Sequence, residues 1–96
     1  MTEKRWEQKR NKVKKILTRN LGKVIAHIRK SVEMGALAVF HTNTGARFEV
    51  GKSLRGGYQA EWYGPGFVLI ARHRELTLRE AAALVLRWEI EDEERN

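Results

Sequence analysis

The sequence predicts an α+β fold with a long N-terminal basic amphipathic helix, an antiparallel meander of three or four strands, and a C-terminal helix packed on the sheet. Three successive patterns of apolar residues predict it. Apolar residues recur every three or four positions up to Val32, alternate in twos from residue 36, and return to helical spacing after Thr77. Consecutive strands between two helices are typical of α+β domains. The 96 residues suffice for one domain with one modest core, so we expect a single domain over 1–96.

The first predicted helix spans 1–35 and has two unlike faces. Its apolar face carries Val13, Ile16, Leu17, Leu21, Val24, Ile25, Ile28 and Val32. Its opposite face carries seven cations, Arg5, Lys9, Lys12, Lys15, Arg19, Lys23 and Lys30. Gly35 is the expected C-terminal stop. The segment 20–22 is either an earlier stop or a kink, so the pattern leaves open whether the helix is continuous through Gly22.

The sheet is predicted over 36–73. Strands at 36–41 and 46–50 are joined by a turn at 43–45, a Gly-rich loop follows at 51–57, and 58–63 forms the next strand. Gly64-Pro65-Gly66 is the next turn. The run 67–71 is apolar on both faces, so we expect this strand to be central or to be covered by a helix on its second side. Alternation places Phe48, Tyr58, Trp62 and Phe67 on the inner face and Tyr63 on the outer face.

The C-terminal helix is predicted over 77–91. Thr77 and Glu80 have the spacing of a capping box, in which each side chain accepts a hydrogen bond from the other residue's backbone N–H. The predicted buried stripe consists of Leu78, Ala81, Ala82, Leu84, Val85 and Trp88. Leu86 and Ile90 lie off this stripe and either widen the core contact or mark a subunit interface. Residues 92–96 are expected to form an acidic tail.

The net charge of +7 is concentrated at the start of the chain. Residues 1–35 hold 11 basic and 3 acidic groups, 36–71 hold 3 and 2, and 72–96 hold 5 and 7. Such a concentration indicates a surface for a polyanion, although a plain solvated helix face has the same composition. Lys52 and Arg55, on the Gly-rich loop, are further candidates for a phosphate contact. Trp6 and Tyr63 are candidate aromatic contacts with a base or a partner protein.

One segment resembles a phosphate-binding loop in its amino-acid sequence but not in its expected secondary structure. Residues 46–53 match a loosened form of that motif, with Ala46 in place of the first glycine and Lys52-Ser53 at its end. A true phosphate loop leads directly into a helix, whereas this segment alternates like a strand and is followed by Gly56-Gly57. We therefore predict that the match is accidental.

No catalytic, metal or cofactor site is predicted. His27, His41 and His73 lack the spacing of metal ligands, and the chain has no cysteine. His41 and His73 on adjacent strands would be the arrangement that acid–base chemistry requires, but no third group accompanies them. Glu49 and Glu61 face each other across the exposed side of the sheet in this scheme, with Arg47 and Gln59 as cross-strand partners. We expect a protein that is not an enzyme and that has no cofactor.

The order helix, three-stranded antiparallel sheet, helix resembles the double-stranded RNA-binding domain, and the Ala-rich segment 80–84 is similar to the last helix of that family. That family grips phosphates with consecutive lysines at the start of its second helix, where this chain offers Arg79 beside Glu75 and Glu80. The stretch 46–88 also resembles the DNA-binding modules of integrase arms, which read a groove with an exposed sheet face. Here Glu49 and Glu61 on that face would repel phosphate.

These observations predict a small basic protein that binds DNA or RNA through the phosphate backbone, using the first helix and the loop at Lys52 and Arg55. The alternative is a protein-binding inhibitor or regulator of the small phage-encoded type, similar to anti-CRISPR or anti-restriction proteins, that acts on a nucleic-acid enzyme. A homodimer is compatible with both hypotheses. The N-terminal residues are charged where a signal peptide is apolar, so we expect a cytoplasmic protein that does not bind membranes.

Overall fold

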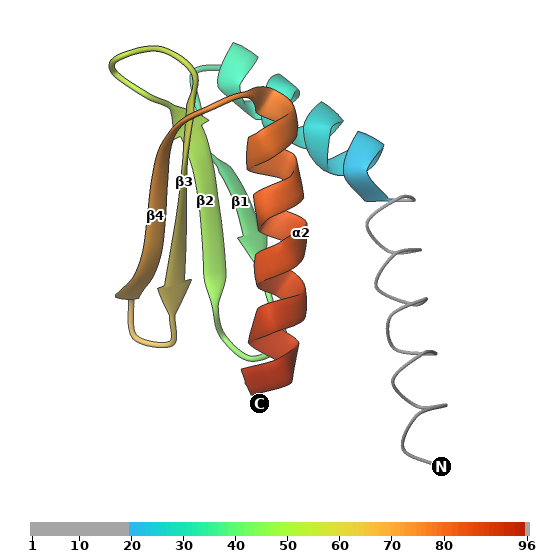
Figure 1. Cartoon of the computed structure of the whole chain (residues 1–96), viewed down its shortest axis with the longest axis vertical. Helices are drawn as coiled ribbons and strands as arrows, with labels where there is room; N and C mark the ends of the chain where they lie inside the picture. The colour runs from blue at the N-terminus through green and yellow to red at the C-terminus, as the bar shows by residue number, and fades with distance from the viewer. Residues whose placement is uncertain (1–19, 96) are drawn as a thin grey trace.

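The computed structural model describes residues 20–95 and confirms the α+β fold. A helix reaches residue 33, and four strands follow, β1 (Ala38–His41), β2 (Arg47–Lys52), β3 (Tyr58–Gly64) and β4 (Val68–Leu76). The chain ends in helix α2 (Leu78–Arg95). The strands form one antiparallel sheet in the order β1-β2-β3-β4, so the meander has four strands (Figure 1).

The N-terminal helix is continuous from residue 20 through Gly22 to residue 33, so no stop occurs at 20–22. Gly35 terminates the helix, as predicted. Gly35 has φ of 76°, its N–H donates to Val32 O, and Ala36 N–H donates to Ser31 O at 2.9 Å. This pair of hydrogen bonds is a Schellman motif, which requires a left-handed residue that glycine provides without strain.

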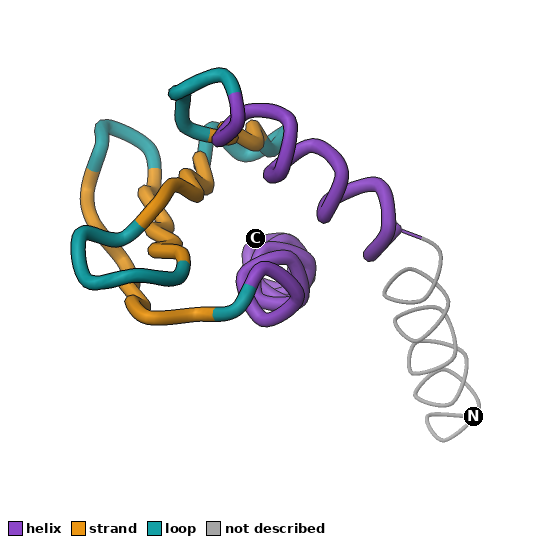
Figure 2. Tube along the Cα trace, turned by 90° about the horizontal axis from the view of Figure 1, so that it is seen from above, coloured by secondary structure: helices purple, strands orange, loops and turns teal. Residues whose placement is uncertain are grey.

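One face of the sheet is covered by both helices. Viewed from above, the sheet curves around one side of α2, and the N-terminal helix passes close to β1 (Figure 2). His27 on this helix meets Phe40 on β1 edge to face, with ring centroids 5.0 Å apart. The other face of the sheet is open to solvent and carries the polar side chains of β2 and β3.

The core is aromatic where α2 crosses the sheet. The rings of Phe48 on β2, Trp62 on β3 and Trp88 on α2 lie within 6.0 Å of one another by their centroids. All three side chains are buried, which confirms that Trp88 packs against the sheet. Leu86 is also buried, so it widens the core contact.

Helix α2 is longer than the sequence predicted. It continues to Arg95, so residues 92–95 belong to the helix instead of an acidic tail. Asp92 is buried and accepts a hydrogen bond from the hydroxyl of Thr44 in the β1–β2 turn. The hydrogen bond fastens the last turns of α2 to the opposite end of the meander, and this long-range contact cannot be read from local sequence.

The prediction for the apolar run at 67–71 was wrong. The run begins the edge strand β4, and the exposed fractions are 67% for Phe67, 64% for Val68, 43% for Leu69 and 39% for Ile70. The two helices cover β1 to β3 more fully than β4, because α2 contacts mainly β3. Phe67 lies in the turn with φ of 63° and is exposed, which corrects its predicted place in the core.

Candidate nucleic-acid interface

The described part of the N-terminal helix has the predicted division between an apolar and a basic face. Val24 and Ile28 are buried in the core, and Leu21, Ile25 and Val32 pack against it. Lys23 and Lys30 are exposed. Because seven residues make nearly two helical turns, these two cations lie on the same side of the helix, away from the buried residues. Both ammonium groups are therefore accessible to a partner.

Most of the predicted basic face lies outside the described residues. This applies to Arg5, Lys9, Lys12, Lys15 and Arg19, and also to Trp6. By sequence, residues 1–19 hold eight basic and two acidic groups, whereas 20–95 hold eleven and ten. The described portion is thus almost neutral, and the excess positive charge belongs to the first nineteen residues.

Lys52 is the last residue of β2, and Arg55 lies in the long loop between β2 and β3 at the upper end of the sheet in Figure 1. Both side chains are exposed. Arg55 and Arg74 line an open depression of about 380 Å³ together with Ser53, Leu54, Gln59 and Glu75. Sequence reasoning missed Arg74, because a register shift between Tyr58 and Ala60 sets its position relative to the loop. The loop thus has one more cation beside it than the sequence indicated.

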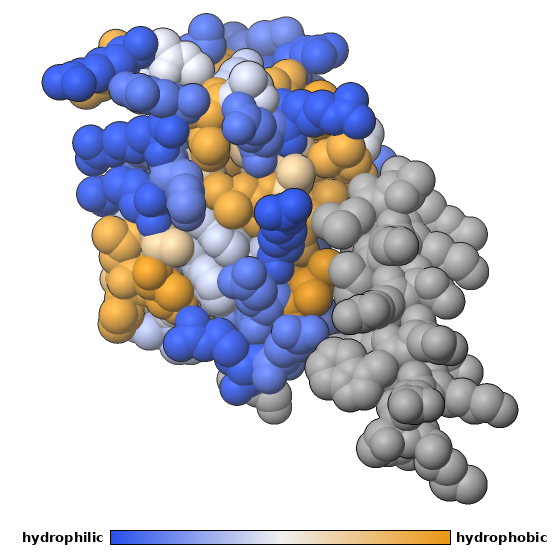
Figure 3. All heavy atoms as spheres, in the orientation of Figure 1, coloured by the Kyte–Doolittle hydropathy of each residue, from blue (hydrophilic) through white to orange (hydrophobic). Residues whose placement is uncertain are grey.

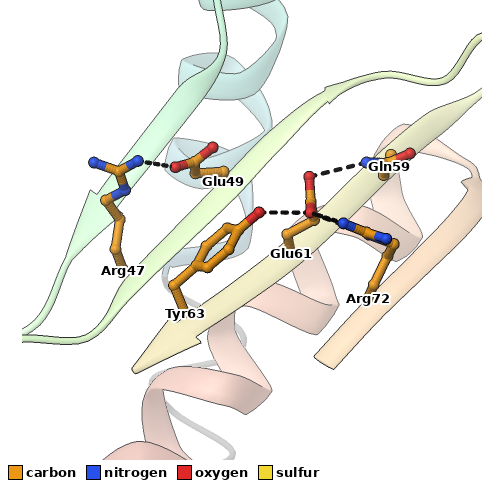
Figure 4. A network of polar contacts seen from close by, with 6 residues as sticks. All are labelled: Arg47, Glu49, Gln59, Glu61, Tyr63 and Arg72. Atoms are coloured by element: carbon orange, nitrogen blue, oxygen red, sulfur yellow. Dashed lines mark hydrogen bonds and ion pairs between the residues drawn. The ribbon is translucent and has the colours of Figure 1, made fainter. Parts of the chain in front are cut away.

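The open face of the sheet holds a polar network centred on Glu61 (Figure 4). Tyr63 Oη donates to Glu61 Oε2 at 2.7 Å, Arg72 donates to the same oxygen at 2.8 Å, and Gln59 donates to Oε1 at 2.9 Å. Partial burial acts to raise the pKa of Glu61, but the hydrogen bonds from Tyr63, Arg72 and Gln59 outweigh it and hold the pKa below its ordinary value. Glu61 is therefore held as a carboxylate.

Glu49 and Glu61 are directly opposite each other in the β2–β3 register, as expected. Their partners differ from the prediction, because Arg47 pairs with Glu49 along its own strand and Gln59 does the same with Glu61. The cross-strand partner is Arg72 on β4. Since Arg47 and Arg72 are both occupied by carboxylates, this face offers little positive charge to a phosphate.

Tyr63 lies on the outer face, as predicted by alternation. Its hydroxyl is engaged by Glu61, and this hydrogen bond, with a smaller effect of desolvation, raises the pKa of Tyr63. Phe67 lies near its ring, at 6.4 Å between centroids, and the Arg47 guanidinium lies 4.5 Å from the Phe67 ring centre. Tyr63 and Phe67 thus form an aromatic corner at the β3–β4 turn.

The other constellations that the sequence analysis weighed, and did not adopt as sites, do not assemble in the described residues. His41 is on β1 and His73 is on β4, at opposite edges of the sheet, so they are not on adjacent strands. The segment that resembles a phosphate loop is strand β2 followed by a turn into β3, without the helix that the motif requires. Residues 20–95 contain no group of three or more His, Cys, Asp or Glu placed to hold a metal ion.

Comparison with known proteins finds no matching family, no matching curated protein and no matching solved structure. The architecture also departs from the double-stranded RNA-binding resemblance, which implied three strands where this sheet has four. Within the described residues, neither helix combines the length and the apolar character needed to cross a membrane. The functional argument therefore rests on the surfaces of this chain alone.

Proposed function

We propose that this protein is a small non-enzymatic nucleic-acid-binding protein that contacts the phosphate backbone through its N-terminal basic segment and the exposed face of its first described helix. The observation that carries the proposal is the orientation of that helix. Val24 and Ile28 are committed to the core, while Lys23 and Lys30 stand in solvent on the far side. A helix fixed in this way presents its cations to a partner without any change in the fold.

The charge distribution supports the same surface. The cations of residues 1–19 precede this helix directly in sequence, and the open sheet face has its arginines paired with carboxylates. Contacts of Lys and Arg with phosphates release counterions and do not read base sequence. We therefore expect binding with little sequence preference, assisted by Lys52 at the end of β2 and by Arg55 in the loop that follows.

The test is the salt dependence of binding to a labelled duplex, measured by fluorescence anisotropy on the full chain. The slope of log K against log salt should be about −0.9 for each phosphate contacted. Lys23→Gln and Lys30→Gln should each weaken binding to unrelated sequences alike and should flatten this slope by about one unit. Parallel titrations with duplex RNA and with single strands identify the preferred nucleic acid.

Arg79→Gln is the matched control, because Arg79 is an exposed residue on α2 and its loss changes the net charge by the same amount. This variant should keep the slope of the wild type. If all three variants flatten the slope equally, binding depends on net charge alone and the helix face is not the site. A wild type without affinity for any of these nucleic acids at low salt contradicts the proposal.

A specific observation also favours the second candidate, a protein-binding inhibitor or regulator of a nucleic-acid enzyme. The β3–β4 turn and the start of β4 expose a continuous group of apolar side chains, Phe67, Val68, Leu69 and Ile70 (lower left of Figure 3). Exposed apolar patches mark contacts with other molecules, and an aromatic ring beside an arginine is typical of the centre of a protein interface. The stacking of Arg47 on Phe67 has this composition.

One experiment distinguishes the two candidate functions. A pull-down from a cell lysate, carried out with and without nuclease, is repeated with Phe67→Asp. The inhibitor hypothesis predicts a partner that survives nuclease treatment and that no longer binds this variant. The nucleic-acid hypothesis predicts partners that disappear on nuclease treatment and that do not depend on Phe67.

A further inference from the structure

The inner side of β4 and the adjacent side of α2 form an open groove of about 320 Å³. Its lining consists of His73, Leu76, Glu80, Ala83, Leu84 and Arg87. The floor is apolar, with Leu76, Ala83 and Leu84 partly exposed, and each end carries a charge. None of the described elements covers this groove. Strand β4 beside it is a free edge that is largely exposed on both faces.

The two charges of the groove have opposite signs and a regular spacing. Glu80, Ala83, Leu84 and Arg87 follow one stripe of α2, because they are separated by three, one and three residues. Glu80 accepts the N–H of Thr77 through Oε1, and a carboxylate has a second oxygen that can accept further bonds. Arg87 is exposed and has no ion pair with another described residue.

This pattern is complementary to itself. A two-fold axis that passes between Ala83 and Leu84 exchanges Glu80 with Arg87, because the two charges stand at equal distances along the helix on either side of that point. Two antiparallel copies of α2 would therefore match Glu80 of one copy with Arg87 of the other, twice. A self-complementary patch of this kind is what a two-fold symmetric dimer requires.

On strand β4, beside the helix, two apolar residues are spaced equally on either side of His73. His73 lies in the same groove as Ala83 and Leu84, and Ile70 and Leu76 stand three residues to either side of it. A two-fold axis that also passes beside His73 would bring Ile70 of one copy toward Leu76 of the other. Ile70 is exposed in the described chain, and a second copy would bury it.

We propose that the groove between β4 and α2 is the interface of a symmetric homodimer, occupied by the same groove of a second copy. The proposal is independent of nucleic-acid binding, because Lys23 and Lys30 are not in this surface. Register shifts interrupt β4 near Ile70 and near Glu75, so a continuous ladder along the strand edge is not expected. Side chains of the groove carry the contact instead.

Sedimentation velocity on the full chain, treated with nuclease and studied over a range of concentrations, tests the dimer. The wild type should shift from monomer to dimer as its concentration rises. Arg87→Glu should raise the dimer dissociation constant about tenfold or more, because it places two carboxylates opposite each other at both ends of the interface. Arg79→Glu changes the net charge equally outside the groove and should dimerise like the wild type.

A mixture of charge variants separates a direct contact from a structural effect. Glu80→Lys and Arg87→Glu should each be monomeric alone, whereas an equimolar mixture should form a heterodimer, because it restores opposite charges at both ends of the interface. A thermal melt shows that each variant is folded. A monomeric wild type at all concentrations overturns the proposal, as does a mixture that stays monomeric.

Cross-linking locates the axis. The chain has no cysteine, so Ala83→Cys introduces one thiol. Residues next to a two-fold axis meet their own copies, and under mild oxidation this variant should form a covalent dimer at a disulfide-compatible distance. Arg79→Cys, which lies outside the groove, should form no covalent dimer although it still associates like the wild type. Equal cross-linking of both variants overturns the assignment of the interface.

Discussion

Trp88 shows how one side chain joins a helix to three strands. It lies on α2 and is 4% exposed, and its ring contacts Phe48 on β2, Trp62 on β3 and the imidazole of His73 on β4. Aromatic pairs at such centroid distances contribute beyond the area that they bury. Trp88 is therefore the residue through which the helix holds the sheet.

Truncation of this residue should be among the most damaging single changes. Trp88→Ala leaves a cavity between α2 and the sheet that the surrounding strands can fill only in part. We expect the free energy of unfolding to fall by about 3 to 5 kcal/mol. Urea denaturation followed by circular dichroism measures it, and an unchanged midpoint would refute the packing described for Trp88.

Glu61 should make stability depend on pH. Its pKa is lowered in the folded protein, so it contributes stability above the ordinary carboxyl pKa of about 4.3, and this contribution disappears as the pH falls through the lowered folded value. Glu61→Gln should therefore be less stable than the wild type at pH 7, and the difference should narrow at about pH 3. Denaturation curves at both pH values test it. A difference that is independent of pH would contradict the role of Tyr63 and Arg72 as partners of a carboxylate.

At the scale of the element, the boundaries of the helices are set by a few residues with defined hydrogen bonds. The capping box is present at the start of α2, where Glu80 N–H donates to Thr77 Oγ1 at 3.1 Å and Thr77 N–H donates to Glu80 Oε1 at 2.9 Å. These bonds satisfy backbone donors that have no partner within the helix. The bond to Thr77 N–H also lowers the pKa of Glu80.

Removal of the cap should have a smaller effect than removal of a core residue. Thr77→Ala removes the acceptor for Glu80 N–H and should lower the free energy of unfolding by about 1 kcal/mol. Thr77→Ser keeps a hydroxyl at the cap and serves as the control, with a stability close to that of the wild type. Thermal melts of the three proteins measure the effect. Equal melting temperatures would show that the cap does not contribute to the stability of the fold.

Strand β2 carries the segment that resembles a phosphate loop. Phe48 and Val50 in this segment are core residues, and their backbone groups pair with β1 and β3, so they cannot wrap around a phosphate. We expect no binding of ATP or GTP by the wild type or by Lys52→Ala. Isothermal titration calorimetry provides the measurement, and binding by the wild type that Lys52→Ala abolishes would contradict this prediction.

At the scale of the whole molecule, the charge and the core occupy different parts of the chain. Among residues 20–95, the buried apolar side chains of the core run from Val24 to Trp88, whereas most of the excess positive charge lies in residues 1–19. Substitution of exposed cations such as Lys23 and Lys30 leaves the described core unchanged. Folding and binding should therefore respond to different substitutions.

A triple variant, Lys12→Gln, Arg19→Gln and Lys23→Gln, tests this separation. Glutamine is a good helix former, so the melting temperature should stay close to that of the wild type. Binding to all nucleic-acid sequences should weaken, and the salt slope should become flatter by about one unit for each phosphate that the variant no longer neutralises. A folded variant that binds as tightly as the wild type at every salt concentration would refute the nucleic-acid proposal and favour a protein partner.

The sequence alone determined the order of the elements, because each depends on neighbours a few positions away. The period of Val24, Ile28 and Val32 predicted the apolar helix face, Gly35 predicted its end, and the spacing of Thr77 and Glu80 predicted the start of α2. The exposure of Lys23 and Lys30 followed from the same periodicity. The parts of the candidate interface that lie on this helix were thus accessible to sequence reasoning.

The tertiary structure alone decided which parts of the sheet are covered. An apolar run such as 67–71 has the same local pattern in a central strand and in a bare edge strand, and only the packing of the two helices leaves β4 exposed. The position of Arg74 beside Arg55 depends on a register shift, and the end of α2 depends on the contact of Asp92 with Thr44. These contacts join residues far apart in the chain, and hydrophobic burial is not directional, so local periodicity does not determine them.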